Sequence, residues 1–188
     1  SVVGGDEVQY QTLMRLRDGA GNLHTAAEVV PLAERAGLVH EVDRRVMAQA
    51  LAVLGRQSQS GNAARLFVPQ SPRTLAQEGY AAWLLESLRD LGVDGGLLVI
   101  DVRLADATVH SLLLREFIER MVGAGVRLCL SQFQSSAEAD ALMAQLPLDY
   151  VRLSPHYAGK SEQQDVQDEM RAVIDRAHML GLQVDLQA

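Results

Sequence analysis

Short apolar runs recur along the chain and alternate with longer stretches in which apolar residues fall at helical spacing. Most of the runs are short and rich in Val, Leu and Ile, as expected for strands that are buried on both faces. They cover residues 8–17, 65–69, 97–102, 126–130, 150–153 and 183–186. This alternation predicts six strands of a parallel sheet, each joined to the next by helical segments.

Several helix boundaries are also visible in the sequence. Thr25 is followed three residues later by Glu28, the spacing of a capping box at a helix start. Residues 41–58 carry apolar side chains at helical spacing, which predicts a helix there. Glycine tolerates the left-handed conformation in which many helices end. It stands where predicted helices should stop, at Gly37, Gly92, Gly125 and Gly181.

The length and the element order define the expected fold class, which is α/β. Repeated βα units predict either a barrel or an open doubly wound sheet, and a complete eightfold barrel needs about 200 residues or more. With 188 residues and six clear strands, we expect a TIM-type (β/α) barrel that is incomplete at both ends. Residues 1–188 are expected to form a single domain and to be a fragment of a larger protein.

The composition indicates which kinds of ligand the chain can bind and in which cellular compartment it is expected. The net charge of −7 argues against a DNA or RNA surface, although a few well-placed arginines can still hold a small anion. The lone cysteine, Cys129, lies within an apolar run and is expected to be a buried core residue. No apolar run approaches the roughly 18 residues of a membrane span. These features predict a cytoplasmic domain that is not embedded in a membrane.

Barrel chemistry takes place at the C-terminal ends of the strands, and there the chain is poor in acids. A site for hard divalent cations needs several carboxylates, whereas only one of the strand-end residues carries a carboxyl group. These residues are Pro69, Gln70, Asp101, Ser131, Gln132, Ser154 and Gln187. The sequence therefore predicts no metal site.

The same segments carry a family resemblance. Residues 11–15 (QTLMR) resemble the signature E-A-L-x-R, and residues 28–38 (EVVPLAERAGL) resemble E-F-I-P-L-A-E-x-x-G-L. Residues 98–103 (LVIDVR) are similar to L-E-L-E-I-T, and residues 130–133 (LSQF) replace L-D-D-F. These motifs, with similar ones to the end of the chain, occur in the order found in EAL domains, the phosphodiesterases of cyclic di-GMP (c-di-GMP). The resemblance implies a modified TIM-type barrel.

The departures from that family imply the loss of its activity. The family holds two metal ions with carboxylates and an Asn, assisted by a Lys. Here the Lys position is Arg152, which stays protonated and cannot shuttle a proton. The former metal or catalytic positions read Gln11, Pro69, Asp101, Ser131, Gln132 and Gln187. We therefore expect no catalytic residue and no metal requirement.

The resemblance also implies a ligand site for c-di-GMP. Arg15 is expected to contact a phosphate from an inner strand, or else to form a structural ion pair. Asp43 is expected to read a guanine edge, or only to cap its helix. Asp101 is either a relic ligand or, as favoured here, the ion-pair partner of Arg15 or Arg103. Arg152 either contacts phosphate or balances Asp101. The full set of expected ligand contacts is Leu13, Met14, Arg15, Asp43, Ser71 and Arg152.

Among degenerate EAL domains, the chain resembles the FimX type, which are c-di-GMP receptors in type IV pilus control. This resemblance implies a PilZ-domain adaptor as partner and, through it, the pilus assembly ATPase, with a role in twitching motility at the cell pole. Two other functions stay open from the sequence. One is a residual phosphodiesterase with an altered metal set, and the other is a scaffold that has lost the ligand.

Overall fold

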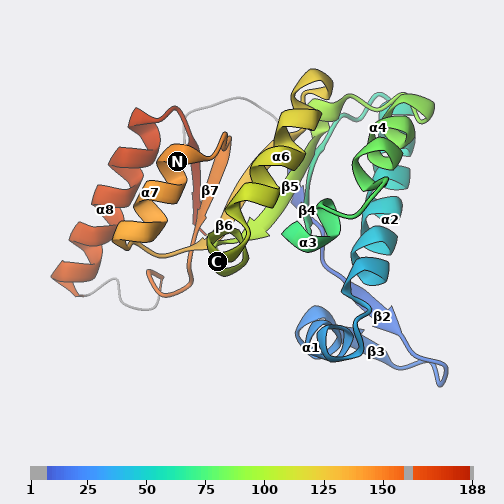
Figure 1. The fold of residues 1–188 in the computed structure, drawn as a ribbon, viewed down its shortest axis with the longest axis horizontal. Coiled ribbons are helices and arrows are strands. Elements are labelled where there is room, and N and C mark those ends of the chain that lie inside the picture. Colours follow the sequence, from blue (N-terminus) through green and yellow to red (C-terminus); the bar gives the residue numbers. More distant parts are fainter. Residues whose placement is uncertain (1–7, 159–162, 187–188) are drawn as a thin grey trace.

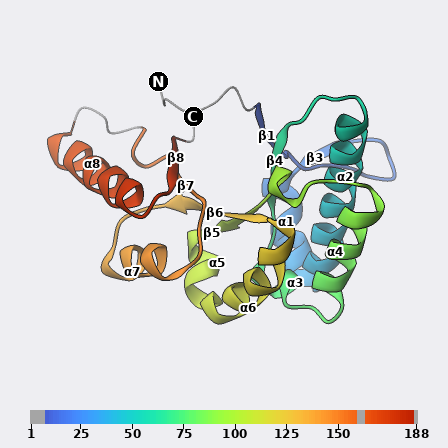
Figure 2. The same cartoon turned by 90° about the horizontal axis from the view of Figure 1, so that it is seen from above.

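The computed structural model describes residues 8–158 and 163–186. Within them, six strands form one parallel sheet in the order β1-β4-β5-β6-β7-β8. The sheet curves as part of a barrel would (Figure 2), so the predicted incomplete TIM-type barrel is confirmed. The strands are β1 (Gln9–Gln11), β4 (Arg65–Pro69), β5 (Leu98–Arg103), β6 (Arg127–Phe133), β7 (Tyr150–Leu153) and β8 (Gln183–Leu186).

Helices cover the convex side of this sheet (Figures 1 and 2). The predicted helix over residues 41–58 is confirmed as the longer α2, and the four glycines that were expected to end helices all have positive φ. The covering helices are α2 (Val39–Gln59), α3 (Pro72–Leu75), α4 (Tyr80–Asp90), α5 (Leu104–Val109), α6 (Ser111–Met121), α7 (Ala137–Gln145) and α8 (Gln164–Met179). No helix in the described part of the chain is long and apolar enough to cross a membrane.

The two faces of the sheet have different surroundings. Side chains alternate along each strand, so residues such as Val68, Ile100 and Leu130 pack outward against the helices in the main core. The inner face carries a small separate apolar cluster formed by Phe67, Val99, Cys129 and Tyr150. Cys129 is therefore a core residue, as predicted, and burial raises the pKa of its thiol well above the usual value. A thiol in this setting is an inert packing group.

The predicted single strand over residues 8–17 is wrong, because the chain leaves the sheet halfway along it. In the parallel ladder, Arg65 N donates to Val8 O and Thr12 N donates to Phe67 O. The next donor in this series would be the nitrogen of Pro69, which carries no hydrogen. The ladder ends there, and the following residues instead form β2 (Arg15–Arg17), antiparallel to β3 (Leu23–Thr25).

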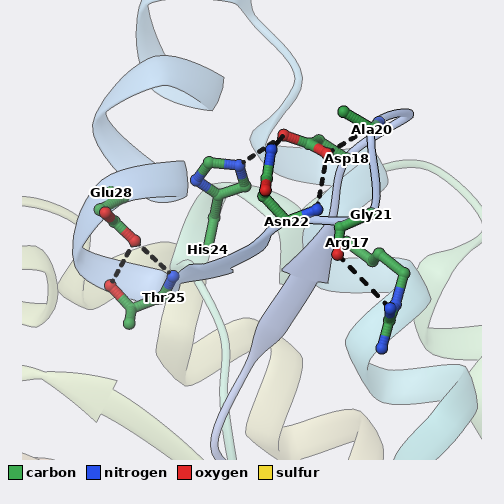
Figure 3. Close-up of polar contacts among 8 residues, drawn as sticks. All are labelled: Arg17, Asp18, Ala20, Gly21, Asn22, His24, Thr25 and Glu28. Carbon is green, nitrogen blue, oxygen red and sulfur yellow. Dashed lines mark hydrogen bonds and ion pairs between the residues drawn. The ribbon is translucent and has the colours of Figure 1, made fainter.

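The β2–β3 hairpin and α1 (Ala26–Ala36) form a lobe at one side of the sheet (Figure 1). Its turn is organised by Asp18, whose carboxylate accepts hydrogen bonds from Asn22 N at 2.9 Å and His24 Nε2 at 3.0 Å (Figure 3). These bonds lower the pKa of Asp18, and the bond to Asp18 raises that of His24. The predicted capping box is confirmed, since Thr25 N donates to Glu28 Oε2 at 2.7 Å.

Candidate functional site

A cleft of about 790 Å³ opens where the strands end. One wall is the C-terminal rim of β1, β4, β5 and β6, and the other is made by α1 together with the start of α2 and the α5 segment. The strands contribute Gln11, Pro69, Asp101, Arg103, Ser131 and Gln132, and the opposite wall includes Ala26, Ala27, Val30, Pro31, Glu34, Val39 and Asp43. The cleft therefore lies at the strand ends, where barrel proteins place their chemistry.

The structure brings some predicted site residues together and separates others. The cleft is lined by seven of them, namely Gln11, Asp43, Pro69, Ser71, Asp101, Ser131 and Gln132. Leu13, Met14, Arg15 and Arg152 are not among the lining residues, and Gln187 lies outside the described residues.

Arg15 had been expected on an inner strand, but it lies in the β2–β3 hairpin outside the parallel sheet. It belongs to β2, is exposed, and its Nη1 donates to the neighbouring Met14 O at 3.1 Å. Its register partner in the hairpin is Thr25, which directly precedes the lining residues Ala26 and Ala27. The hairpin thus pairs Arg15 with the residue that precedes one wall of the cleft, and the ligand role of Arg15 stays a prediction.

Asp101 forms a buried ion pair with Arg152. Arg152 Nη1 lies 3.2 Å from Asp101 Oδ2, and the two residues are 6% and 5% exposed. The expectation that Asp101 pairs with Arg15 or Arg103 is wrong, because Arg152 reaches it across the inner face of the sheet. Burial raises the pKa of the Asp101 carboxyl group, and Ser131 and Arg152 offset part of that rise.

Arg152 is itself fixed from several sides. Its guanidinium lies 4.7 Å from the ring centre of Phe67, and its Nη2 is 3.7 Å from Asp185 Oδ2. A guanidinium held this way places a permanent positive charge directly beside the carboxylate at the strand ends.

The donor set at this rim does not fit a pair of divalent cations. Magnesium and similar ions are held by several carboxylate oxygens. The carboxylate of Asp101 is already paired with the guanidinium of Arg152. Gln11 and Gln132 offer neutral oxygens, and Pro69 has no side-chain oxygen. Within residues 8–158 and 163–186, no three His, Cys, Asp or Glu side chains are grouped to hold a metal ion.

Asp43 joins α2 to the start of α3. Its Oδ2 accepts hydrogen bonds from Ser71 N at 2.9 Å and from the buried Thr74 Oγ1 at 2.6 Å. Burial raises the pKa of Asp43, and the bonds from Thr74 and Ser71 counter that rise. The expectation that Asp43 caps its own helix is wrong, because Asp43 lies inside α2 and its carboxylate instead holds the first turn of α3, whose N-cap is Ser71. Asp43 also lines the cleft, and its ligand role stays a prediction.

Gln70, another strand-end residue, is a structural tie. Its Nε2 donates to Asp43 O at 2.9 Å and to Pro69 O at 2.8 Å, while its Oε1 accepts from Tyr80 Oη at 2.5 Å. All three contacts are internal, so Gln70 fastens α2 and α4 to the end of β4. This rigid connection holds Asp43 at a fixed position in the wall of the cleft.

Gln132 has strained backbone geometry at the rim. Its φ is 52°, and among the described residues it alone combines positive φ with a side chain. The pairing of β6 with β7 shifts register between Leu130 and Phe133, as at a bulge. Bulges next to functional sites re-aim side chains, and here the bulge turns Gln132 into the cleft.

The sequence did not indicate an ion-pair network that joins the strand wall of the cleft to α1. Arg103 Nε donates to Asp106 Oδ2 at 2.9 Å, and its Nη2 lies 3.9 Å from Glu34 Oε1 on α1. Arg103 had been considered only as a partner of Asp101. The available signal was strand periodicity, since Arg103 follows Asp101 by two residues and so shares its inner face.

Comparisons with known proteins agree with this fold. The family model of the EAL domain matches residues 1–185. The crystal structure of the FimX EAL domain from Pseudomonas aeruginosa bound to c-di-GMP superimposes with a TM-score of 0.89 at 22% identity, covering 98% of this chain and 74% of that one. The Xanthomonas citri FimX EAL domain in complex with c-di-GMP gives 0.88 at 24% identity, covering 95% and 70%.

Two curated relatives match over 145 residues, or 77% of this chain. One is the cyclic di-GMP phosphodiesterase PdeB of Shewanella oneidensis, at 21% identity and 17% coverage of its length. The other is an uncharacterized 76.5 kDa protein of Thiocystis violacea, at 24% identity and 21% coverage. The matched region thus spans about a fifth of the length of these relatives.

Proposed function

The chain belongs to the EAL domain family, and from that premise we propose that it is a receptor that binds c-di-GMP in the cleft without hydrolysing it. The observation that carries this proposal is the buried ion pair between Asp101 and Arg152. It neutralises Asp101, the one acid among the described strand residues that line the cleft, and leaves the cleft able to accept an anion without a metal.

The chemistry of phosphodiester hydrolysis supports the absence of turnover. A two-metal site generates hydroxide and clamps the attacking and leaving oxygens, which requires carboxylates at fixed positions. In this chain Gln11 and Ser131 stand where the similar family segments have carboxylates, and Pro69 stands where they have an Asn. Arg152 cannot act as a general base, because a guanidinium stays protonated at any working pH.

The walls of the cleft support binding of a guanine dinucleotide. Apolar side chains such as Val30, Pro31 and Val39 offer surfaces for a planar base. Asp43 presents a carboxylate, which can accept hydrogen bonds from the two adjacent N–H donors on the edge of guanine. Adenine has no such pair of adjacent donors. The FimX EAL domains that share this fold were crystallised with c-di-GMP.

The experiment is isothermal titration calorimetry of the chain with c-di-GMP, in EDTA and then in Mg²⁺, with c-di-AMP as the control ligand. We expect c-di-GMP to bind with the same affinity in both buffers and c-di-AMP to bind much more weakly. Binding that requires Mg²⁺, or a continuing heat of turnover, would revive a residual phosphodiesterase. Absence of binding in both buffers would leave a scaffold without ligand.

The proposal extends to a partner through the resemblance to FimX-type chains. A receptor without catalysis needs an output, and we propose a PilZ-domain adaptor that connects this domain to the pilus assembly ATPase in the cytoplasm at the cell pole. A pull-down with a purified PilZ-domain protein, with and without c-di-GMP, tests this step. Recovery of no complex in either condition would remove the partner from the proposal and leave ligand binding untouched.

A further inference from the structure

We propose that Arg103 binds a phosphate of the dinucleotide in this chain, and that Glu34 on α1 competes with the ligand for it. The inference rests on the proposed c-di-GMP binding. It adds a residue that the resemblance does not supply, because Arg103 stands where the similar family segment has a threonine.

The position of Arg103 follows from strand alternation. Asp101 and Arg103 are two residues apart on β5, so their side chains leave the sheet on the same inner face. Both line the cleft, with Arg103 nearer the open rim, because β5 ends at that residue. The guanidinium of Arg103 is therefore closer to the opening of the cleft than the buried ion pair of Asp101 and Arg152, and it is not part of that pair.

The guanidinium of Arg103 is only partly engaged. Its hydrogen bond to Asp106 uses Nε, and the contact with Glu34 at 3.9 Å is an ion pair beyond hydrogen-bond distance. The side chains of Arg103 and Glu34 are 50% and 54% exposed. Exposed pairs of this kind contribute little stability. The terminal N–H groups are therefore available for the bidentate contact that arginine makes with phosphate.

The other cation of the strand ends is not available in the same way. Arg152 is buried, bonded to Asp101 and stacked on Phe67, and it does not line the cleft. A dianionic ligand therefore meets Arg103 on the strand side of the cleft. There the ligand competes with Glu34, which pairs with Arg103 from α1.

This arrangement makes opposite predictions for the two partners of one ion pair. Loss of Arg103 removes a charge-assisted contact to phosphate, so Arg103→Ala should raise the Kd for c-di-GMP by about tenfold to a hundredfold. Arg103→Lys should fall between, since an ammonium cannot form the bidentate contact. Glu34→Gln should lower the Kd by about twofold to fivefold, because it removes a competing charge.

The test is calorimetry with c-di-GMP on these variants, with the exposed Arg35→Ala of α1 as the control for a general loss of positive charge. Arg35→Ala should bind like the unmodified chain, and Glu34→Gln should have no effect when combined with Arg103→Ala. If Arg103→Ala does not fold, the Kd values of Arg103→Lys and Glu34→Gln still test whether Arg103 contacts phosphate and whether Glu34 competes for it.

Two outcomes separate this inference from the function on which it rests. If the unmodified chain binds c-di-GMP and Arg103→Ala binds equally well, Arg103 is not a phosphate ligand and the receptor function stands. If the unmodified chain binds no c-di-GMP, both proposals fall. If Glu34→Gln also lowers the Kd in the Arg103→Ala background, Glu34 does not act by competing for Arg103, and that part of the proposal falls.

Discussion

The guanidinium of Arg152 on β7 lies 3.2 Å from the carboxylate of Asp101 on β5, across the inner face of the sheet. The two residues are 51 positions apart in the chain and both are buried. Asp101 Oδ1 is buried without a hydrogen-bond partner among the described residues. Asp101 thus depends on Arg152 for its main electrostatic compensation.

Arg152→Met should lower the free energy of unfolding by about 3–5 kcal/mol, the cost of leaving a buried charge without its partner. The double variant Asp101→Leu with Arg152→Met removes both charges and should recover most of that loss. Urea unfolding at pH 7 measures both. A single variant as stable as the unmodified chain would show that the pair contributes nothing.

The loss in Arg152→Met should also depend on pH. The folded-state pKa of Asp101 is raised by burial, so the folded state binds protons more tightly than the unfolded state. Stability from this group is therefore present below the ordinary carboxyl pKa and is lost as the pH rises through the raised value. Without Arg152 the pKa of Asp101 rises further, so the destabilisation should shrink as the pH falls toward 4.

Restoring one carboxylate should not restore hydrolysis. Gln11→Glu adds one acid to the cleft that Pro69 and Ser131 also line, but it leaves the guanidinium of Arg152 beside Asp101. Ligands of a two-metal site act as a unit. Chromatography after long incubation of c-di-GMP with Mg²⁺ or Mn²⁺ should show no linear dinucleotide, while an active EAL phosphodiesterase in the same assay should produce it. Turnover by the unmodified chain that a chelator abolishes would refute the receptor proposal.

Arg15→Ala should weaken c-di-GMP binding by about 2–3 kcal/mol, the size of a charge-assisted bond to phosphate. Arg17 provides a matched control, because it is exposed on the same face of β2 but lies farther along the hairpin, where its Nη1 donates to Gly21 O. Arg17→Ala should bind like the unmodified chain. Equal effects of the two variants would place the phosphate away from this rim.

Asp43→Asn should separate the structural and ligand roles of this residue. Its amide oxygen can still accept from Ser71 N and Thr74 Oγ1, so stability should change little, while loss of the charge should reduce the preference for guanine over adenine dinucleotides. Asp43→Ala removes the carboxylate that accepts from both Ser71 N and the buried Thr74 hydroxyl, which should cost about 1–3 kcal/mol of stability. Thermal unfolding measures the change in stability, and competition binding measures the change in selectivity. Unchanged selectivity in Asp43→Asn would leave only the structural role of Asp43 between α2 and α3.

Gln132→Val should lower the free energy of unfolding, whereas Gln132→Gly should not. A β-branched residue at a φ of 52° should destabilise by about 1–2 kcal/mol. Glycine adopts this conformation without strain and should leave stability equal or up to about 1 kcal/mol higher. Denaturant unfolding of both variants measures the difference, and equal stabilities would mean that the bulge relaxes to a different backbone.

Much of the fold could be predicted from the chain because it depends on local patterns. The strands around Val68, Ile100 and Val151 follow from short apolar runs, and the capping box at Thr25 follows from spacing alone. The scarcity of carboxyl groups at the strand ends could also be read from the chain, because it is a matter of residue chemistry. A side chain such as that of Pro69 offers no oxygen in any fold.

The tertiary structure alone decided which of these residues meet. The partner of Asp101, the tie made by Gln70 and the contact of Arg103 with Glu34 join segments far apart in the chain. The departure of the chain from the sheet after Thr12 depended on which nitrogen of β4 faced it, and that nitrogen belongs to Pro69. Periodicity shows which face of a strand a side chain occupies. The curvature and register of the sheet determine what lies opposite, because they set the distances across the cleft and across the inner face.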